Sequence, residues 1–181
     1  MITGPSGVGK GTLIRGLLEQ MPGLELSVSA TTRQPRPGES DGIDYHFLTP
    51  AEFERRVGTG EFLEHATYSG NRYGTLREEV ERRLAQGRPV VLEIEVQGAR
   101  QVRESMPDAV AVFIAPPTPE ALRARLIGRG TDSPEQVDAR MRTAERELDA
   151  QSEFPHVVVN DRLEQATDEL VAIVRAALDG R

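Results

Sequence analysis

Residues 4–12 read Gly4-Pro5-Ser6-Gly7-Val8-Gly9-Lys10-Gly11-Thr12, a run that contains the spacing G-x-x-x-x-G-K. Glycines let consecutive backbone N–H groups turn toward one anion, because no Cβ blocks the approach. A helix that follows such a turn adds the positive end of its dipole. The lysine supplies a compact positive charge that can follow the β- and γ-phosphates of a nucleotide. The run therefore predicts a phosphate-binding loop, the P-loop.

The hydroxyl that usually follows the lysine of a P-loop comes one position late in this chain. Gly11 follows Lys10, and the hydroxyl is that of Thr12. A hydroxyl in this region takes part in Mg²⁺ binding, so Thr12 is the expected metal-binding residue. Whether it would bind Mg²⁺ directly or through water stays open. The alternative for the whole run is a glycine-rich turn that caps an ordinary helix.

Lys10 is the only lysine of the chain. The sequence has 181 residues, of which 22 are lysine or arginine, so the other 21 basic residues are arginines. The broad planar fork of an arginine does not fit inside a narrow ring of backbone, whereas an ammonium group does. The position of the single lysine therefore supports the P-loop prediction.

The overall composition excludes several classes of protein. With 22 basic and 29 acidic residues the net charge is −7, which argues against a general binder of nucleic acid or of anionic membranes. There are no cysteines, so disulfides and thiolate metal sites are excluded. No apolar run reaches the roughly 18 residues of a membrane helix. No secretory signal is recognisable, and we expect a cytoplasmic protein.

Apolar, β-rich runs alternate with helical patterns along most of the chain. Strands separated by helices predict βαβ units and a parallel sheet flanked by helices, that is, an α/β fold. The expected strands are Leu24–Ala30, Arg88–Val96, Ala109–Ala115 and His156–Asn160, and the expected helices are Gly11–Gln20, Thr75–Gln86, Gly98–Ser105, Pro119–Ile127, Pro134–Gln151 and Leu163–Leu178. Only Met1–Thr3 precede the P-loop, so either the first strand is very short or the chain starts late.

Residues 31–74 break this alternation. Short strand-like pieces at Asp44–Leu48 and Phe62–Tyr68 flank a small helix that Thr49-Pro50-x-Glu52 would begin, with Thr49 as N-cap. We therefore expect a small mixed-β insertion at 31–74 on a core made of 1–30 and 75–181. A polar break between two helices predicts a helical lid near 125–142.

Two arginines of the insertion suggest a second phosphate site. Arg33 and Arg36 lie in the sequence near a cluster of hydroxyl residues and Tyr45. One arginine guanidinium can donate two parallel hydrogen bonds to a phosphate group. The alternative is a solvated surface loop. A P-loop about 20 residues upstream favours the phosphate site.

The sequence resembles the guanylate kinase family. The resemblance covers almost the whole chain and rests on the run Ser27–Phe47 (S-x-S-x-T-T-R-x-P-R-x-G-E-x-x-G-x-D-Y-x-F) and on shorter blocks at Phe62–Glu64, Gly70–Thr75, Glu93–Ala99, Phe113–Pro117, Gly128–Gly130 and Val159–Asp161. It implies a P-loop NTPase fold and the reaction ATP + GMP → ADP + GDP in purine nucleotide metabolism, with Mg²⁺. The implied partners are GMP and ATP, without nucleic acid or membrane; the oligomeric state does not follow.

The resemblance also implies roles for individual residues. The GMP phosphate would be held by Arg33, Arg36, Tyr45 and Tyr73, and the guanine would be contacted by Ser29, Glu64, Thr75 and Glu95. ATP would be bound by residues 4–12 with Arg129 and Asn160, and catalysis would use Lys10, Arg125, Arg129 and Arg140, with Arg142 as a further candidate. The alternative for the lid arginines is that they merely pair with Glu120, Asp132, Glu135 and Asp138.

The expected role of Glu64 can be checked from the chemistry of the base. Guanine presents N1–H and N2–H₂ side by side, and a carboxylate accepts from both. Adenine lacks this pair, and unpaired buried polar groups can cost on the order of 10⁴ in specificity. Glu95 departs from the family, which more often has aspartate at this place, so its contact with guanine or with Mg²⁺-bound water stays open.

Two other classes of protein remain as alternatives. A non-catalytic guanylate kinase-like interaction domain would keep the fold, but such domains commonly lack the P-loop lysine and the lid arginines, which this chain retains. A different P-loop kinase, such as an adenylate kinase, would share the run G-K-G-T. The Ser29–Phe47 block and Glu64 argue against it.

Overall fold

The computed structural model describes residues 1–128 and 133–180. The chain forms two compact units: Met1–Pro22 together with Val110–Arg181, and Gly23–Ala109. The expected insertion at 31–74 lies wholly inside the second unit.

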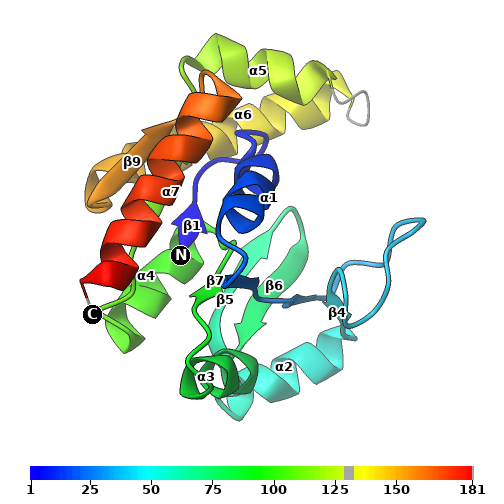
Figure 1. The fold of residues 1–181 in the computed structure, drawn as a ribbon. Helices are drawn as coiled ribbons and strands as arrows, with labels where there is room; N and C mark the ends of the chain where they lie inside the picture. The colour runs from blue at the N-terminus through cyan, green and yellow to red at the C-terminus, as the bar shows by residue number, and fades with distance from the viewer. Residues whose placement is uncertain (129–132, 181) are drawn as a thin grey trace. The chain divides into compact units, whose positions relative to one another are not determined.

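The first unit contains a three-stranded parallel sheet in the order β1-β8-β9 (Figure 1). Strand β1 is Ile2–Thr3, β8 is Val112–Ala115 and β9 is His156–Val159. The first strand is therefore very short, and it pairs Ile2 with Val112. The central strand is buried along its whole length, as expected for a parallel sheet covered on both faces. The strands predicted at 109–115 and 156–160 are present with shorter bounds, as Val112–Ala115 and His156–Val159.

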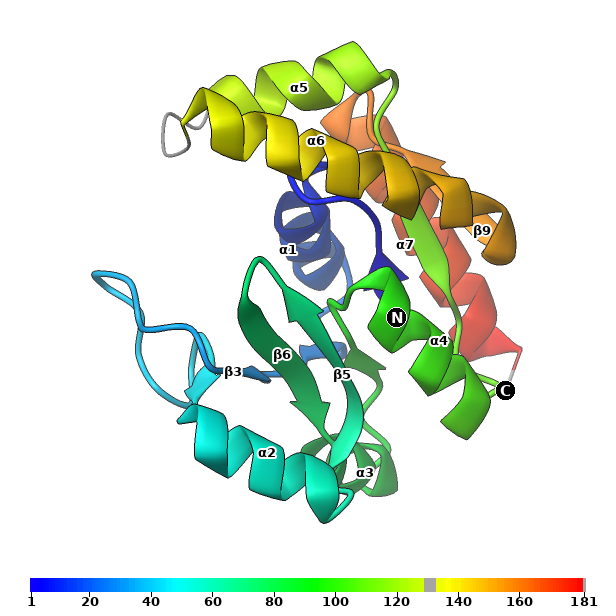
Figure 2. The same cartoon turned by 180° about the vertical axis from the view of Figure 1, so that it is seen from behind.

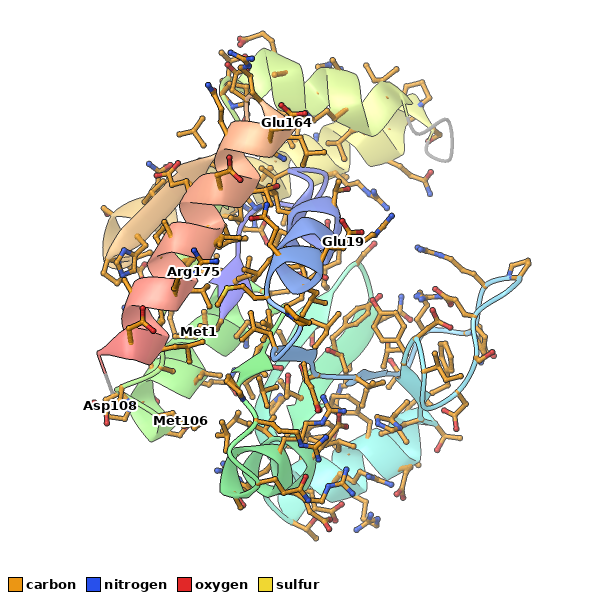
Figure 3. The ribbon with its side chains drawn as sticks, viewed as in Figure 1. Met1, Glu19, Met106, Asp108, Glu164 and Arg175 are labelled. Atoms are coloured by element: carbon orange, nitrogen blue, oxygen red, sulfur yellow. The ribbon has the colours of Figure 1, made fainter. Side chains whose placement is uncertain are left out.

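Helices α1 (Lys10–Gln20) and α7 (Leu163–Asp179) lie side by side in this unit (Figure 1). Their approach is close, since a Cβ added at Gly16 would lie 2.9 Å from Thr167 Cγ2. The exposed side chains of Glu19, Glu164 and Arg175 on these helices are labelled in Figure 3. The buried side chains include Leu13, Ile14 and Leu17 of α1 and Leu170 and Val171 of α7, so each helix turns an apolar side to the interior of the unit.

A second helix pair completes the first unit. Helices α5 (Pro119–Gly128) and α6 (Pro134–Asp149) lie side by side in both views of the ribbon (Figures 1 and 2), and the short helix η1 (Ala150–Glu153) follows. A capping box begins α6: Ser133 Oγ accepts from Gln136 N, and the Gln136 side chain accepts from Ser133 N. Such a cap satisfies two N–H groups that a helix leaves open.

The second unit contains the expected small mixed sheet, in the order β4-β3-β6-β5 (Figure 2). Its strands are β3 (Ser29–Thr31), β4 (His46–Phe47), β5 (Phe62–Tyr68) and β6 (Asn71–Leu76). Only β3 and β4 are parallel to each other. Helix α2 (Pro50–Gly58) starts as predicted, because Thr49 Oγ1 accepts from Glu52 N at 3.2 Å. Phe53 of this helix packs on Phe62 in the core.

Three expectations about the second unit are wrong in part. The single strand predicted over Leu24–Ala30 is two short strands in different sheets, β2 (Glu25–Leu26) and β3. The predicted strand over Arg88–Val96 is regular only at β7 (Val90–Val91), which pairs with β2. The chain after β7 stays extended, and helix α4 (Val96–Ser105) already begins at Val96. The helix expected over Thr75–Gln86 starts two residues later than predicted, as α3 (Arg77–Ala85), because Thr75 is in β6. Pairing with Ser29 of β3 keeps Thr75 in the strand, which is a long-range interaction that local helical pattern does not contain.

Among the residues that the structure describes, no helix is both long enough and apolar enough to cross a membrane.

Candidate functional site

The P-loop residues lie between β1 and α1 with the backbone that their glycines allow. Gly4, Gly7 and Gly9 have φ of 142°, 88° and 100°, values that residues with a Cβ rarely adopt. A Cβ on Gly7 would lie 2.6 Å from Leu126 Cδ2, and one on Gly9 would lie 2.6 Å from Asn160 Nδ2. One on Gly4 would overlap the backbone of Ile114. Both conformation and space therefore require glycine at these three positions.

Lys10 points into the loop that precedes it. Its side chain is almost completely buried, with 9% of the residue exposed. The ammonium donates to the carbonyl oxygens of Gly4 at 2.6 Å and of Pro5 at 3.3 Å. Helix α1 begins at this residue, and the N–H groups of Lys10 and Gly11 at its start precede the first intrahelical bonds, which Thr12 and Leu13 donate to the Gly9 carbonyl oxygen. The arrangement gathers one full and several partial positive charges around the loop.

The carbonyl oxygen of Val8 is held by two distant side chains. Asn160 Nδ2 donates to it at 2.8 Å, and a guanidinium nitrogen of Arg125 donates to it at 3.0 Å. Arg125 also donates to the Asn160 carbonyl oxygen at 2.7 Å. Arg125 thus contacts the backbone of the loop, which excludes a role limited to pairing with a carboxylate.

The other lid arginines and the expected metal-binding residue Thr12 are placed differently. Arg129 lies outside the described residues. Arg140 is half-buried on α6, and Thr12 is exposed in the first turn of α1. The carboxylate of Asp138 pairs with Arg123, at 2.7 Å, and Glu135 accepts from Ser133 Oγ. Two of the four carboxylates considered as partners of the lid arginines thus bond to Arg123 and to Ser133.

A buried carboxylate lies in the second unit. Glu64, on β5, is 3% exposed. Thr75 Oγ1 of the neighbouring strand donates to Glu64 Oε1 at 2.7 Å. Burial raises the pKa of Glu64 to about 7, and the charge of Glu95 adds to this rise, while the bonds from Thr75 oppose it. This carboxylate can therefore change its protonation near neutral pH.

A second carboxylate accompanies Glu64. Glu95 is the N-cap residue of α4, and its side chain makes no capping bond. Its Oε2 atom is buried and has no hydrogen-bond partner among the residues that the structure describes. Ser29 is the residue opposite Thr75 in the sheet. Buried acceptors without donors usually mark a place where a ligand or water binds.

Arginine and tyrosine side chains gather further along the same unit. The guanidinium of Arg33 lies 5.2 Å from the centre of the Tyr45 ring, and the rings of Tyr45 and Tyr73 are 6.2 Å apart. Burial raises the pKa of the Tyr45 hydroxyl, with a smaller contribution from the charge of Glu93. Arg36 is exposed. The structure therefore brings together three of the four residues expected at the GMP phosphate.

Comparison with known proteins identifies the family. The family model for guanylate kinase matches residues 1–177. The chain belongs to the guanylate kinase family. It is 53% identical to a guanylate kinase of Thermobifida fusca over 97% of this chain and 90% of that protein. It is 50% identical to one of Mycobacterium leprae over 99% and 87%.

Solved structures agree with this result. The crystal structure of guanylate kinase from Anaplasma phagocytophilum matches with a TM-score of 0.77 and 34% identity, over 97% of this chain and 82% of that one. A gluconokinase from Sinorhizobium meliloti, at 21% identity and a TM-score of 0.55 over 98% and 92%, shares the fold alone. The predicted family, the P-loop NTPase fold and the prediction of a nucleoside monophosphate kinase are confirmed.

Sequence reasoning missed two residues beside this candidate site. Glu39 Oε1 accepts from Arg33 at 2.8 Å, and its Oε2 accepts from Arg36 N at 2.7 Å. Gly98, on α4, lies against the carboxylate of Glu64. Both residues stand inside the quoted motif blocks, so their position in the motifs was the available signal. Their contacts are long-range or depend on the loop conformation, which a motif does not describe.

Proposed function

We propose that this protein transfers the γ-phosphoryl group of ATP to GMP, giving ADP and GDP. The observation that carries the proposal is the buried carboxylate of Glu64, to which Thr75 Oγ1 donates at 2.7 Å. The charge of Glu95 acts on it, and the buried Oε2 of Glu95 has no hydrogen-bond partner among the residues that the structure describes. Buried acceptors of this kind match a ligand that presents adjacent donors. Guanine presents N1–H and N2–H₂ in this way.

The same geometry favours GMP over AMP. Adenine has no N–H at position 1 and no amino group at position 2. With AMP bound, the acceptors of Glu64 would be left desolvated and unpaired, and a site built for hydrogen bonds discriminates strongly against an analogue that lacks them. Because the pKa of Glu64 is about 7, donors from guanine would also favour its ionised form.

The phosphate of GMP is proposed to bind at Arg33, Arg36, Tyr45 and Tyr73. Arg33 is held by Glu39 and by the Tyr45 ring, so its guanidinium is oriented before a ligand arrives. Arginine and tyrosine donors match a phosphate better than they match an uncharged group. We propose that the part of the chain at 31–74, which contains these residues, is the GMP-binding subdomain.

ATP is proposed to bind at the P-loop, residues 4–12, with Lys10 following its β- and γ-phosphates. Arg125 and Asn160 would support ATP binding indirectly. They donate hydrogen bonds to the carbonyl oxygen of Val8 and so hold the conformation of the loop. Arg140 and Arg129 remain proposed cations for the transferring group, on a lid near 125–142. Residues 1–30 and 75–181 would form the core that carries these parts.

The residues beside the P-loop fit Mg²⁺ only in part. The exposed hydroxyl of Thr12 is the one side-chain oxygen that the first turn of α1 offers. Mg²⁺ commonly keeps several waters and takes phosphate oxygens as ligands, so one protein hydroxyl is compatible with it. When bound with ATP, Mg²⁺ would neutralise charge between the phosphates.

The reaction needs no nucleophilic side chain. The acceptor is a phosphate oxygen of GMP, which is already anionic near pH 7. The task of the protein is therefore to position two nucleotides, to stabilise charge and to exclude water, as in other phosphoryl transfers. A role in purine nucleotide metabolism in the cytoplasm, with GMP and ATP as small-molecule partners, accords with this chemistry.

A coupled assay of ADP formation tests the proposal, with ATP as donor and GMP, dGMP and AMP as acceptors. We expect turnover with GMP and a much lower kcat/KM with AMP. Faster turnover with AMP would identify a different P-loop kinase. Absence of turnover, together with absence of nucleotide binding, would favour a non-catalytic interaction domain.

A further inference from the structure

The carboxylate of Glu64 occupies space that a side chain at position 98 would need. A Cβ added to Gly98 would overlap Glu64 Oε2 and would lie 2.8 Å from its Cδ. Real Cβ atoms essentially never come this close to another heavy atom. The present position of Glu64 is therefore compatible with glycine at position 98 and with no larger residue.

Backbone conformation does not explain this glycine. Gly98 is the third residue of α4 and is not among the residues with positive φ. Alanine could adopt the same helical backbone conformation, and it has a higher helix propensity than glycine. The space taken by Glu64 is thus the physical reason for a glycine here.

The carboxylate is held from two sides. Thr75 Oγ1 donates to Oε1 at 2.7 Å, while Oε2 lies against Gly98. The side chain is 3% exposed, so it is enclosed by protein. A methyl group at position 98 would displace the carboxylate from the position in which it accepts from Thr75.

We propose that Gly98 is a specificity-determining residue for the purine base, because its missing side chain lets Glu64 present its carboxylate to guanine. This inference rests on the proposed function. Gly98 touches Glu64, not the reacting atoms, so it is a positioning residue. Its effect on GMP comes through the direction of the Glu64 carboxylate.

The variant Gly98→Ala tests this. The atom that the methyl would meet is the far end of a flexible side chain, so we expect the fold to survive with a displaced carboxylate. A displacement of about an ångström costs roughly 10- to 100-fold in kcat/KM for GMP. Turnover of AMP, which has no donors for this carboxylate, should change less than twofold. The ratio of kcat/KM for GMP to that for AMP should therefore fall.

Gly58→Ala is the matched control. Gly58 is also a helical glycine of the second unit, at the end of α2, and nothing lies within 4 Å of a Cβ added there. We expect its KM for GMP to equal that of the wild type. If Gly98→Ala also equals the wild type, the inference is overturned although the proposed function stands. If the wild type itself does not prefer GMP to AMP, the proposed function fails.

A double-mutant cycle decides whether the effect passes through Glu64. In a Glu64→Ala background the atoms that the methyl would overlap are gone, so adding Gly98→Ala should change GMP binding less than twofold. An equal loss in both backgrounds would overturn the inference. If Gly98→Ala alone unfolds, the double variant should regain the melting temperature of Glu64→Ala. Failure to regain it would show that the methyl meets something else, and this too would overturn the inference.

Discussion

Asn160 and Val8 are 152 positions apart in the sequence, and the Asn160 side-chain amide donates to the Val8 carbonyl oxygen at 2.8 Å. Arg125 donates to the same oxygen. The end of β9 and the helix α5 thus hold one peptide group in the middle of the P-loop. A loop rich in glycine has many accessible conformations, and these bonds select the one in which the loop surrounds the Lys10 ammonium.

Replacing Arg125 should weaken ATP binding. A hydrogen bond to a charged group contributes about 1.5–3 kcal/mol, so we expect Arg125→Gln to raise the KM for ATP roughly 10- to 100-fold, with a smaller change in the KM for GMP. Steady-state kinetics with each nucleotide varied in turn measures this. Arg123→Gln is the control on the same helix, because Arg123 pairs with Asp138 at an exposed site, where such pairs contribute little. Equal effects of the two substitutions would contradict the expectation.

Replacing Lys10 should separate transfer from GMP binding. We expect Lys10→Met to abolish ADP formation while GMP still binds, because the proposed GMP residues belong to the other unit. Lys10→Arg should also be inactive, since a guanidinium does not fit where the ammonium lies beside the Gly4 carbonyl oxygen. The coupled assay and calorimetric titration with GMP measure the two properties. Transfer that survives in Lys10→Met would refute the P-loop assignment.

Glu64 should make stability depend on pH. Its pKa is about 7 in the folded protein and 4.5 ordinarily, so between these values the folded chain keeps a proton that the unfolded chain loses. The favourable contribution of the protonated form is complete below pH 4.5 and is lost as the pH rises through about 7. Compared with Glu64→Gln, the free energy of unfolding of the wild type should fall by on the order of 3 kcal/mol as the pH rises over this range.

Urea unfolding of the wild type and of Glu64→Gln at intervals from pH 4.5 to 8 measures this difference. The two curves of unfolding free energy should diverge as the pH rises and then run parallel above pH 7.5. Curves that stay parallel from pH 4.5 upward would show that Glu64 is ionised in the folded protein throughout.

Glu39 should affect the GMP site without affecting the chemical step. Its carboxylate joins the Arg33 guanidinium and the backbone N–H of Arg36. We expect Glu39→Gln to raise the KM for GMP about 3- to 10-fold with kcat nearly unchanged. This pattern results when a lost interaction had stabilised the bound substrate and the transition state equally. Glu54→Gln is a suitable control, because Glu54 pairs with Arg72 on an exposed part of the same unit. A lower KM in Glu39→Gln would mean that Glu39 repels the phosphate of GMP.

The chemistry of neighbouring residues in the sequence was sufficient to predict many of the helices, strands and loops. The P-loop follows from its glycines, the helix after Thr49 from its capping residue, and the strands at 62–68 and 112–115 from aromatic and β-branched residues, all of which act on their immediate neighbours. It was insufficient for Thr75, where pairing with Ser29 overrides a helical pattern. It was also insufficient for residues 92–95, where the alternating sequence Leu92-Glu93-Ile94-Glu95 lies between the end of β7 and the start of α4 and forms no regular strand.

The sequence by itself determined which chemical groups are available: a single lysine in a glycine-rich loop, arginines beside tyrosines, and a glutamate among family motifs. Only the tertiary structure decided how these groups act. Burial moves the pKa of Glu64 toward neutrality, the missing side chain of Gly98 gives its carboxylate room, and Asn160 and Arg125 meet at one carbonyl oxygen. The reason is physical: solvation, steric exclusion and long-range hydrogen bonds depend on which distant residues become neighbours, whereas motifs record only the order of residues along the chain.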